Sequence, residues 1–307
     1  MLRKQRRSGQ KRYSITLWSD EKFRKVPYNH FEKFVSEKAD RFTLLRSVLD
    51  ECSLGYSILK IDRKHHIAVP VAHNHDAASG YAESSIILTA HYDRAPRSPG
   101  ANDNGAAVFQ LIETALVFKK QKTGKSALFI FTDGEELAKG ESLRLQGSYS
   151  LGLHLRENGL GNIPVFSFDA CGTGDTIIIS TASEELLKNE TGEGAEAARR
   201  KAQTLRSLAL EAARKVRLEK VLLLPTPFSE DAGFLLSGMT AQTITALPQA
   251  EAALARGDYS AMFLNTDRRL IPETWRILNS PGDSPLRLTP EHWKNIVAFA
   301  EALAISG

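Results

Sequence analysis

The stretch SIILTAHYD at residues 85–93 indicates how this chain folds, because a short apolar run ends there in His91 and an aspartate. The stretch ALFIFTDGEE at residues 127–136 has the same form and ends in two glutamates. VFSFDACG at residues 165–172 places Asp169 after a third apolar run. Such runs are typical of strands buried on both faces of a parallel sheet. Ligands of open α/β sheets bind beyond the carboxyl ends of the strands, so these polar residues are expected along one edge.

Helices are predicted between and around these strands. The spacing of apolar residues indicates helices at His30–Glu51, Gly105–Lys119, Gly194–Arg217 and Pro290–Ile305. Further strands are expected at Tyr56–Asp62, His66–Val71, Thr176–Ser180 and Ala241–Leu247. The alternation of strands with helices predicts a layered α/β domain with a largely parallel core.

The composition is that of an ordinary globular protein, with 307 residues of which 42% are hydrophobic and 25% charged. It contains no run of about 18 apolar residues, the length that a membrane-spanning helix needs, so no membrane partner is expected. The basic N-terminus is not followed by the apolar segment of a signal peptide. Cys52 and Cys171 match no metal or redox spacing. We therefore expect reduced thiols and a cytoplasmic protein.

The charge is concentrated in a short tail. The net charge is +4, but residues 1–12 hold six basic residues and no acid, so residues 13–307 are slightly acidic. This distribution argues against a nucleic-acid partner. We expect a flexible tail at 1–12 followed by one domain at 13–307.

Polar residues at the strand ends are candidates for chemistry. His91 and Asp93 point the same way from a strand end, so Asp93 can fix the imidazole tautomer, as carboxylates do for metal-bound histidines. A polar turn explains the pair as well. Asp103 lies in a turn-rich loop before an apolar helix, where it either caps that helix or bridges two metal ions.

Three further carboxylates extend the pattern. Glu135 and Glu136 follow a buried strand, so that one can bind a metal while the other acts as a general base; a solvated acidic turn is the alternative. Asp169 ends an apolar strand, where a carboxylate is costly unless it is paired, metal-bound or capping a turn. Imidazole and carboxylates at matching strand ends predict a zinc site, and they also suit manganese or cobalt.

Other polar residues have simpler interpretations. The histidines grouped near one predicted strand are explained by a polar strand end; they are His65, His66, His73 and His75. Cys171 is interpreted as a small buried thiol. The charges of the helix near 194–217 have mixed signs and indicate a solvated face.

At these positions the sequence resembles the co-catalytic zinc aminopeptidases, which include bacterial leucine and Streptomyces-type enzymes and are related to glutamate carboxypeptidase and glutaminyl cyclase. The resemblance runs from about residue 30 to 305 and is carried by ILTAHYD, PGANDNGAA, FIFTDGEE, FSFDACG, Gly147 and Ser148, FSEDAGFLLSGMTAQTI and ILNSPGDSPLRLTPEHWKNIVAF. It implies a single α/β domain, a three-layer sandwich in which a mixed, mostly parallel sheet lies between helices.

The resemblance also implies roles for individual residues. The residues that it places at the metals are His91, Asp103, Glu136, Asp169 and Asn279. His91, Asp103 and Asp169 would hold the first ion, while Asp103 would bridge to a second ion held by Glu136. Glu135 would be the general base, and Asp93 would support His91. The peptide bond between Asp103 and Asn104 is expected to be cis.

The sequence departs from the family pattern at three places. Asn279 stands where the family has its final histidine ligand, and an amide oxygen is a poorer zinc ligand than imidazole. Asp231 stands where the family has the histidine of a Ser-Asp-His motif, and it could offset that loss if it approached the metals. His292 is expected on the surface of the last helix. The segment Leu137–Gln146 is longer than in most aminopeptidases and is expected to form a rim loop over the pocket.

We predict a zinc-dependent metallohydrolase of the aminopeptidase type, with one or two zinc ions and a peptide substrate. Two alternatives stay open. A glutaminyl-cyclase-like acyltransferase is favoured by the long segment after Glu136. A catalytically weak metal-binding homologue is favoured by Asn279 and Asp231.

Overall fold

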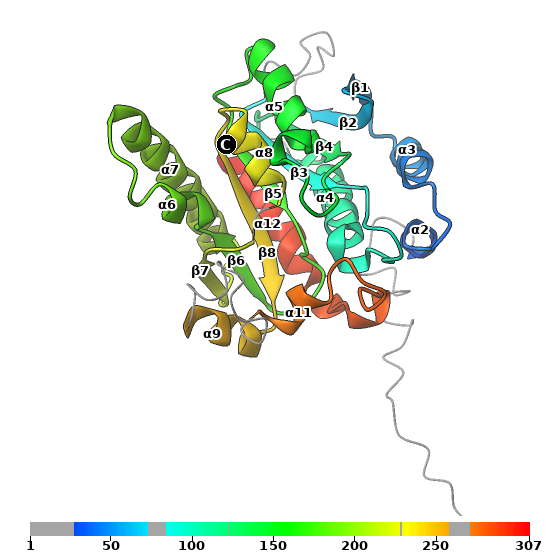
Figure 1. The fold of residues 1–307 in the computed structure, drawn as a ribbon. Coiled ribbons are helices and arrows are strands. Elements are labelled where there is room, and N and C mark those ends of the chain that lie inside the picture. Colours follow the sequence, from blue (N-terminus) through cyan, green and yellow to red (C-terminus); the bar gives the residue numbers. More distant parts are fainter. Residues whose placement is uncertain (1–27, 73–83, 122, 228, 258–270) are drawn as a thin grey trace, which may run out of the picture.

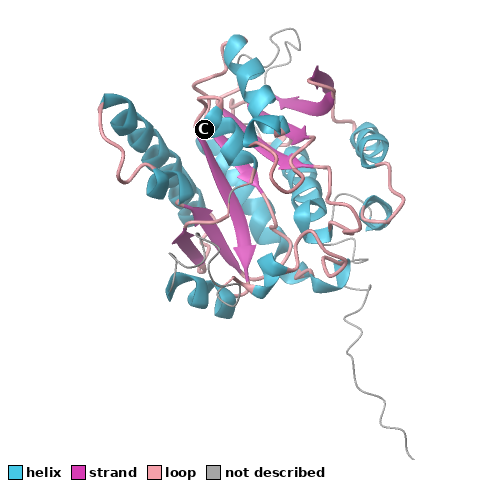
Figure 2. Cartoon of the chain, in the orientation of Figure 1, coloured by secondary structure: helices cyan, strands magenta, loops and turns pink. Residues whose placement is uncertain are grey.

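The chain is described here from a computed structural model, which covers residues 28–72, 84–121, 123–227, 229–257 and 271–307 (Figures 1 and 2). Eight strands form one sheet in the order β1-β2-β4-β3-β5-β8-β6-β7. Their bounds are β1 Ser57–Ile61, β2 Lys64–Val71, β3 Ile86–His91, β4 Ala127–Thr132, β5 Val165–Phe168, β6 Thr176–Ser180, β7 Val221–Leu224 and β8 Ala241–Leu247.

The sheet is mixed, as predicted. The central strands β4, β3, β5 and β8 run parallel to one another, so their carboxyl ends meet at one edge. β2 pairs antiparallel with β4, and β6 pairs antiparallel with β8. Every residue of β3, β4, β5 and β8 is buried, because helices cover both faces of the sheet.

Two helical layers sandwich the sheet (Figure 1). One contains α4 (Ala107–Phe118), α7 (Glu193–Lys215) and α12 (Trp293–Ser306), and α12 packs against both other helices. The opposite layer contains α5 (Gly147–Glu157) and α8 (Glu230–Leu236), which pack together. The remaining helices lie around the sheet and are α2 Tyr28–Phe34, α3 Arg41–Glu51, α6 Ala182–Leu186, α9 Gln249–Gly257 and α11 Glu273–Arg276.

The sequence of each helix matches its environment. α4 is apolar nearly all round and buries ten of its twelve residues between the sheet and α12. α7 buries only a stripe of small and apolar residues that includes Ala202, Leu205 and Ala209, so its charged face is solvated, as predicted. No helix within the described ranges is long and apolar enough to cross a bilayer.

The prediction of one helix at His30–Glu51 is wrong. α2 ends at Phe34, and α3 begins only after Asp40. Asp40 has extended backbone angles, and its carboxylate accepts hydrogen bonds from the backbone N–H and hydroxyl of Thr43. An N-cap of this kind starts a new helix, although the apolar spacing continues through it.

Candidate metal centre and active site

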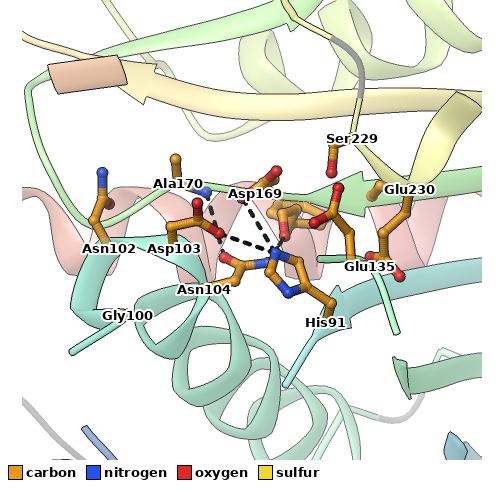
Figure 3. Close-up of polar contacts among 12 residues, drawn as sticks. His91, Gly100, Asn102, Asp103, Asn104, Glu135, Asp169, Ala170, Ser229 and Glu230 are labelled. Atoms are coloured by element: carbon orange, nitrogen blue, oxygen red, sulfur yellow. Dashed lines mark hydrogen bonds and ion pairs between the residues drawn. The ribbon is translucent and has the colours of Figure 1, made fainter. Parts of the chain in front are cut away.

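His91, the last residue of β3, faces the carboxylates of Asp103 and Asp169 with one ring nitrogen at the carboxyl edge of the sheet (Figure 3). Its Nε2 is 3.1 Å from Oδ1 of Asp103 and 3.8 Å from Oδ1 of Asp169, which follows β5. One ligand atom from each of the three residues lies within 4.8 Å of the others. The structure thus brings together three of the predicted metal ligands.

The donor atoms of this group fit a metal ion. Among the described residues, no hydrogen bond of normal geometry reaches either ring nitrogen of His91, Oδ1 of Asp169 or Oε1 of Glu136, although these atoms are buried. Buried polar atoms without partners are rare because their desolvation is not compensated. A cation would compensate it, and imidazole with carboxylates is a donor set that zinc accepts.

Asp103 lies in a loop that is held at two points. One is Asp283, far along the chain, and the other is the end of β5. The carboxylate of Asp283 accepts the backbone N–H of Asn102 at 2.8 Å and that of Asp103 at 3.0 Å. The peptide bond between Asp103 and Asn104 is cis, as the resemblance predicts. The Asn104 side chain donates to the Phe168 carbonyl at 2.7 Å, which ties this loop to the strand that precedes Asp169. α4 has no side-chain cap, so the capping interpretation of Asp103 is not observed.

Asp93 joins the ends of β3 and β4. Its Oδ1 lies 3.4 Å from Nδ1 of His91, on the side of the ring opposite to the other two carboxylates. Its two carboxylate oxygens also accept the backbone N–H groups of Glu135 at 3.2 Å and Glu136 at 3.1 Å. One side chain therefore holds His91 and both glutamates, which are half-buried rather than part of a solvated turn.

Gln146 contacts Glu135 directly, a contact that sequence reasoning did not predict. Its Nε2 donates to Oε1 of Glu135 at 3.1 Å. Its Oε1 accepts from the Ser148 hydroxyl and from the Gly233 backbone N–H, both at 3.2 Å. The following Gly147 approaches so closely that a Cβ would lie 1.8 Å from the Asp133 carbonyl oxygen. The Gly-Ser pair thus places Gln146 against Glu135.

Arg41 is a second residue that sequence reasoning missed. Its buried guanidinium donates to the carbonyls of Phe34, Tyr92, Asp93, Pro99 and Gly100. These contacts tie α3 to the loop that leads from His91 to Asp103. Burial lowers the pKa of Arg41 to about 10, so it remains charged at neutral pH. An arginine at a helix start beside apolar residues was the one available signal.

Burial and the negative charges of neighbouring carboxylates raise the pKa values of three acidic residues in the site. Burial raises the pKa of Glu135 well above its usual range, and Asp169 and Asp103 raise it further, while His91 opposes the shift. Burial, with Asp103 nearby, raises the pKa of Glu136 to about 8. Burial and Asp169 raise the pKa of Asp103. A bound cation would lower all three values, because it stabilises the ionised carboxylates.

A pocket of about 220 Å³ opens beside this centre, and Asp103, Glu135 and Asp169 form part of its lining. Asn279 also lines the pocket, although its side chain is exposed and it does not join the group of His91, Asp103 and Asp169. The charge of Asp103 raises the pKa of Glu136, but Glu136 is not part of the group of His91, Asp103 and Asp169 either. The predicted ligand set is therefore only partly assembled among the described residues.

The other predicted residues are placed as follows. Asp231 is buried at the start of α8 and accepts the Ser229 backbone N–H at 3.0 Å. Its neighbour Glu230 accepts hydrogen bonds from the hydroxyls of Thr89 and Thr132. Cys171 is a buried thiol, as interpreted. His292 is partly buried at the start of α12.

The remaining predictions concern loops and histidines. His65 and His66 lie on β2, whereas His73, His75 and the tail at 1–12 are outside the described residues. The segment 137–146 is mostly exposed, and Gln146 at its end is buried.

Residues 71–220 match the model of peptidase family M28. The matched region contains six of the seven predicted site residues, all except Asn279. Aminopeptidase YwaD of Bacillus subtilis (strain 168) is 40% identical over 89 residues, which are 29% of this chain and 18% of YwaD. Two further curated relatives are matched over 6% and 15% of their length, so the chain spans a small part of these proteins.

Solved structures share the fold of most of this chain. A leucine aminopeptidase precursor from Bacteroides thetaiotaomicron superposes with a TM-score of 0.64 and 14% identity, over 91% of this chain and 95% of that one. A glutaminyl cyclase from Porphyromonas gingivalis has a TM-score of 0.60 and 14% identity, over 91% and 94% of the two chains. At such identities the likeness is one of fold.

Proposed function

We propose that this chain is a zinc-dependent aminopeptidase that removes N-terminal residues from peptides. The observation that carries the proposal is the grouping of His91, Asp103 and Asp169 beside Glu135 at the edge of an M28 fold. The relative YwaD supports it, because its matched stretch belongs to a protein named as an aminopeptidase.

Each residue is assigned a step that its contacts permit. His91, Asp103 and Asp169 would hold the metal ion, and Glu136 would share a second ion with Asp103. When bound, zinc supplies Lewis-acid polarisation of the scissile carbonyl. Glu135 is the general base, which takes a proton from the attacking water and transfers it to the leaving amine. Asp93 and Gln146 hold His91 and Glu135 in place.

A second candidate is the cyclisation of N-terminal glutaminyl residues. The fold is similar to that of the Porphyromonas gingivalis cyclase over nearly its full length, and the long segment 137–146 borders Glu135. In that reaction Glu135 would move a proton within the substrate rather than from water. The two candidates share a site and differ in whether a peptide bond is cleaved.

The test is a substrate panel with a base-removed variant. The zinc-loaded protein should cleave peptides with a free N-terminus and leave N-acetylated copies intact. Glu135→Gln should retain the zinc content and lose about 10²–10⁴-fold in kcat, the usual contribution of a positioned general base. Glu196→Gln, which changes an exposed glutamate of α7, is the matched control. Mass spectrometry of glutaminyl peptides separates cyclisation, which loses ammonia, from cleavage.

Two results would reject the proposal. One is near-normal cleavage by Glu135→Gln. The other is a zinc-loaded protein that cleaves no peptide in the panel, which would favour a binding role for the fold.

A further inference from the structure

A larger pocket, of about 370 Å³, lies on the face of the sheet that α7 and α12 cover. It opens where α7 ends and α12 begins, and it shares no lining residue with the pocket beside the metal centre. Its volume is in the range of small-molecule sites, roughly 300–1,000 Å³. The apolar part of its lining belongs to the main core or packs against it, and consists of Ile177, Val216, Leu218, Ala246 and Ile296.

Several polar side chains of this lining pair with one another. The Lys220 ammonium forms an ion pair with Asp175, whose carboxylate also accepts the Gln249 backbone N–H at 2.8 Å. Nδ1 of His292 lies 3.3 Å from the amide nitrogen of Asn295, within hydrogen-bond distance. The charges of Lys220 and Asp175 therefore compensate each other.

Of the acidic and basic residues in this lining, Arg217 and Glu219 remain. Both are exposed, and within the described ranges no ion pair or side-chain hydrogen bond reaches either of them. They carry opposite charges and stand two residues apart in the loop that connects α7 to β7. The pocket thus offers one unpaired guanidinium and one unpaired carboxylate beside an apolar surface.

Arg217 stands at a backbone position that favours glycine. The Leu218 N–H donates to the Ala213 carbonyl at 3.0 Å, which closes α7 in a Schellman motif. In this motif Arg217 has a φ of 53°, in the left-handed region that is unfavourable for a residue with a Cβ. The last turn of α7 already holds Arg214 and Lys215, the basic residues that suit a helix C-terminus. The end of the helix therefore does not require an arginine at this position.

The two unpaired charges and the apolar surface match the groups of a free amino acid. A guanidinium suits the planar geometry of a carboxylate, so Arg217 would bind the carboxylate of the ligand. Glu219 would bind its ammonium group, and an aliphatic side chain would lie against the apolar lining. A fatty acid or an amine would satisfy only one of the two charges.

We propose that this pocket binds a free aliphatic amino acid, with its carboxylate on Arg217 and its ammonium on Glu219. The site is separate from the metal centre, and the inference goes beyond the proposed function. An aminopeptidase reaction would release molecules of this class.

Calorimetry of the zinc-loaded protein tests the chemical class of the ligand. Acetohydroxamate is present throughout, so that the metal centre is occupied by a ligand with neither an ammonium nor a carboxylate. L-Leucine should bind at one site per chain. Isocaproate lacks the ammonium and isoamylamine lacks the carboxylate, so each should bind about three- to fivefold more weakly, the usual effect of a partly exposed ion pair. Glycine should bind at least about tenfold more weakly, because it buries no side chain.

Charge-removing variants test which pocket is occupied. Arg217→Gln should weaken the binding of leucine and of isocaproate about three- to fivefold. Glu219→Gln should weaken the binding of leucine to the same extent and should not weaken that of isocaproate. Arg214→Gln, which changes an exposed arginine of α7 outside the pocket lining, is the matched control and should bind leucine normally.

Arg217→Gly separates a binding role from a structural one. Glycine suits the left-handed backbone, so this variant should lose leucine affinity and unfold at the same or a higher temperature. A lower unfolding temperature would mean that Arg217 holds the end of α7, and it would overturn the assignment. So would the absence of leucine binding at about 10 mM, binding that both Gln variants retain, or isocaproate binding as tight as that of leucine. None of these measurements needs turnover, so the inference can hold or fail whether or not the protein cleaves peptides.

Discussion

At the scale of single residues, the contact between Gln146 and Glu135 bears most directly on the proposal that Glu135 is the general base. Gln146 is itself fixed by Ser148 and Gly233, so its amide presents a rigid donor to one oxygen of Glu135. A carboxylate that serves as a base must be held within a narrow range of positions, and a small displacement lowers the rate. We therefore predict that Gln146 positions Glu135 and does not itself react.

Gln146→Met keeps the volume of the side chain and removes its donor. We expect kcat to fall about tenfold, since a hydrogen bond to a charged group is worth roughly 1.5–3 kcal/mol and only part of it acts in the transition state. KM and zinc content should stay close to normal. The measurement is steady-state kinetics with metal analysis.

The matched control is Gln121→Met, which breaks the same kind of contact between a glutamine and Glu301 on the surface. If both variants lose the same activity, or if Gln146→Met changes only KM, Gln146 does not position Glu135.

Among single residues, sequence reasoning named the three candidate metal ligands that lie together and missed the residues that hold their neighbours in place. His91, Asp103 and Asp169 follow or border apolar strands, so the pattern of the chain marked them. Gln146 reaches Glu135 across a loop of 11 residues, and Arg41 reaches backbone carbonyls as far along the chain as Gly100. These contacts depend on how the loops fold, which no strand or helix pattern indicates.

At the scale of elements, β2 places a buried histidine behind the site. His66 accepts the Asp133 backbone N–H at 3.2 Å, and burial lowers its pKa to about 4. The charged or titratable groups that face it come from its own strand, from the ends of β3 and β4 and from α5; they are Lys64, His65, Asp93, Asp133 and His154. The imidazole is therefore neutral in the folded protein at neutral pH.

The neutral state of His66 predicts a loss of stability in acid. Between pH 6.5 and 4 the unfolded chain binds a proton at this position and the folded protein does not, so the free energy of unfolding falls as pH falls through this window. The contribution is about 3 kcal/mol for a shift of this size. His66→Asn keeps an acceptor for the Asp133 N–H and removes the imidazole that titrates. The free energy of unfolding of this variant should therefore fall less in acid, by about that amount.

Urea unfolding at pH 7.5 and 4.5 measures this difference, with a chelator present so that metal release does not contribute. His292→Asn, at a partly exposed histidine, is the control and should retain the full loss. An equal acid loss in His66→Asn and the unmodified protein contradicts the prediction.

The helices and strands that the sequence predicts correctly are those marked by a regular local pattern of apolar residues. The bounds expected at Ala127–Thr132, Val165–Phe168 and Ala241–Leu247 are those observed, because buried strands are short apolar runs flanked by polar residues. α5 and α8 were not predicted. Each begins inside a segment that carries site residues, where motif residues such as Gly147 and Ser148 mask the helical pattern.

At the scale of the whole molecule, the site depends on segments that meet only when the sheet forms. The ends of β3, β4 and β5 bring His91, Glu135 and Asp169 together, and the chain returns to this edge more than 100 residues later with Asn279. A substitution in that last segment can therefore change the metal centre without affecting the fold. Asn279 is exposed, has a positive φ of 60° and lines the pocket without joining the described metal-binding group.

This arrangement predicts two unequal metal sites. His91, Asp103 and Asp169 supply three protein ligands, which is the number that a catalytic zinc site uses. A second ion would have Glu136 and a shared Asp103, with an amide where the resemblance implies imidazole. Removing a residue that only supports a metal ligand lowers metal affinity roughly 10–100-fold. Removing the ligand itself should lower the affinity at least as much. We expect nearer one tightly held zinc per chain than two.

Asn279→His should raise the tightly bound zinc toward two ions per chain, because it restores a neutral nitrogen donor at the pocket wall. Equilibrium dialysis with elemental analysis gives this count without reference to activity. Asn189→His adds a histidine at an exposed position just after the end of α6 and should leave the count unchanged. Two tightly held ions in the unmodified protein would contradict the prediction, and they would mean that another described carboxylate, with Asp231 as the first candidate, reaches the second ion in place of the missing imidazole.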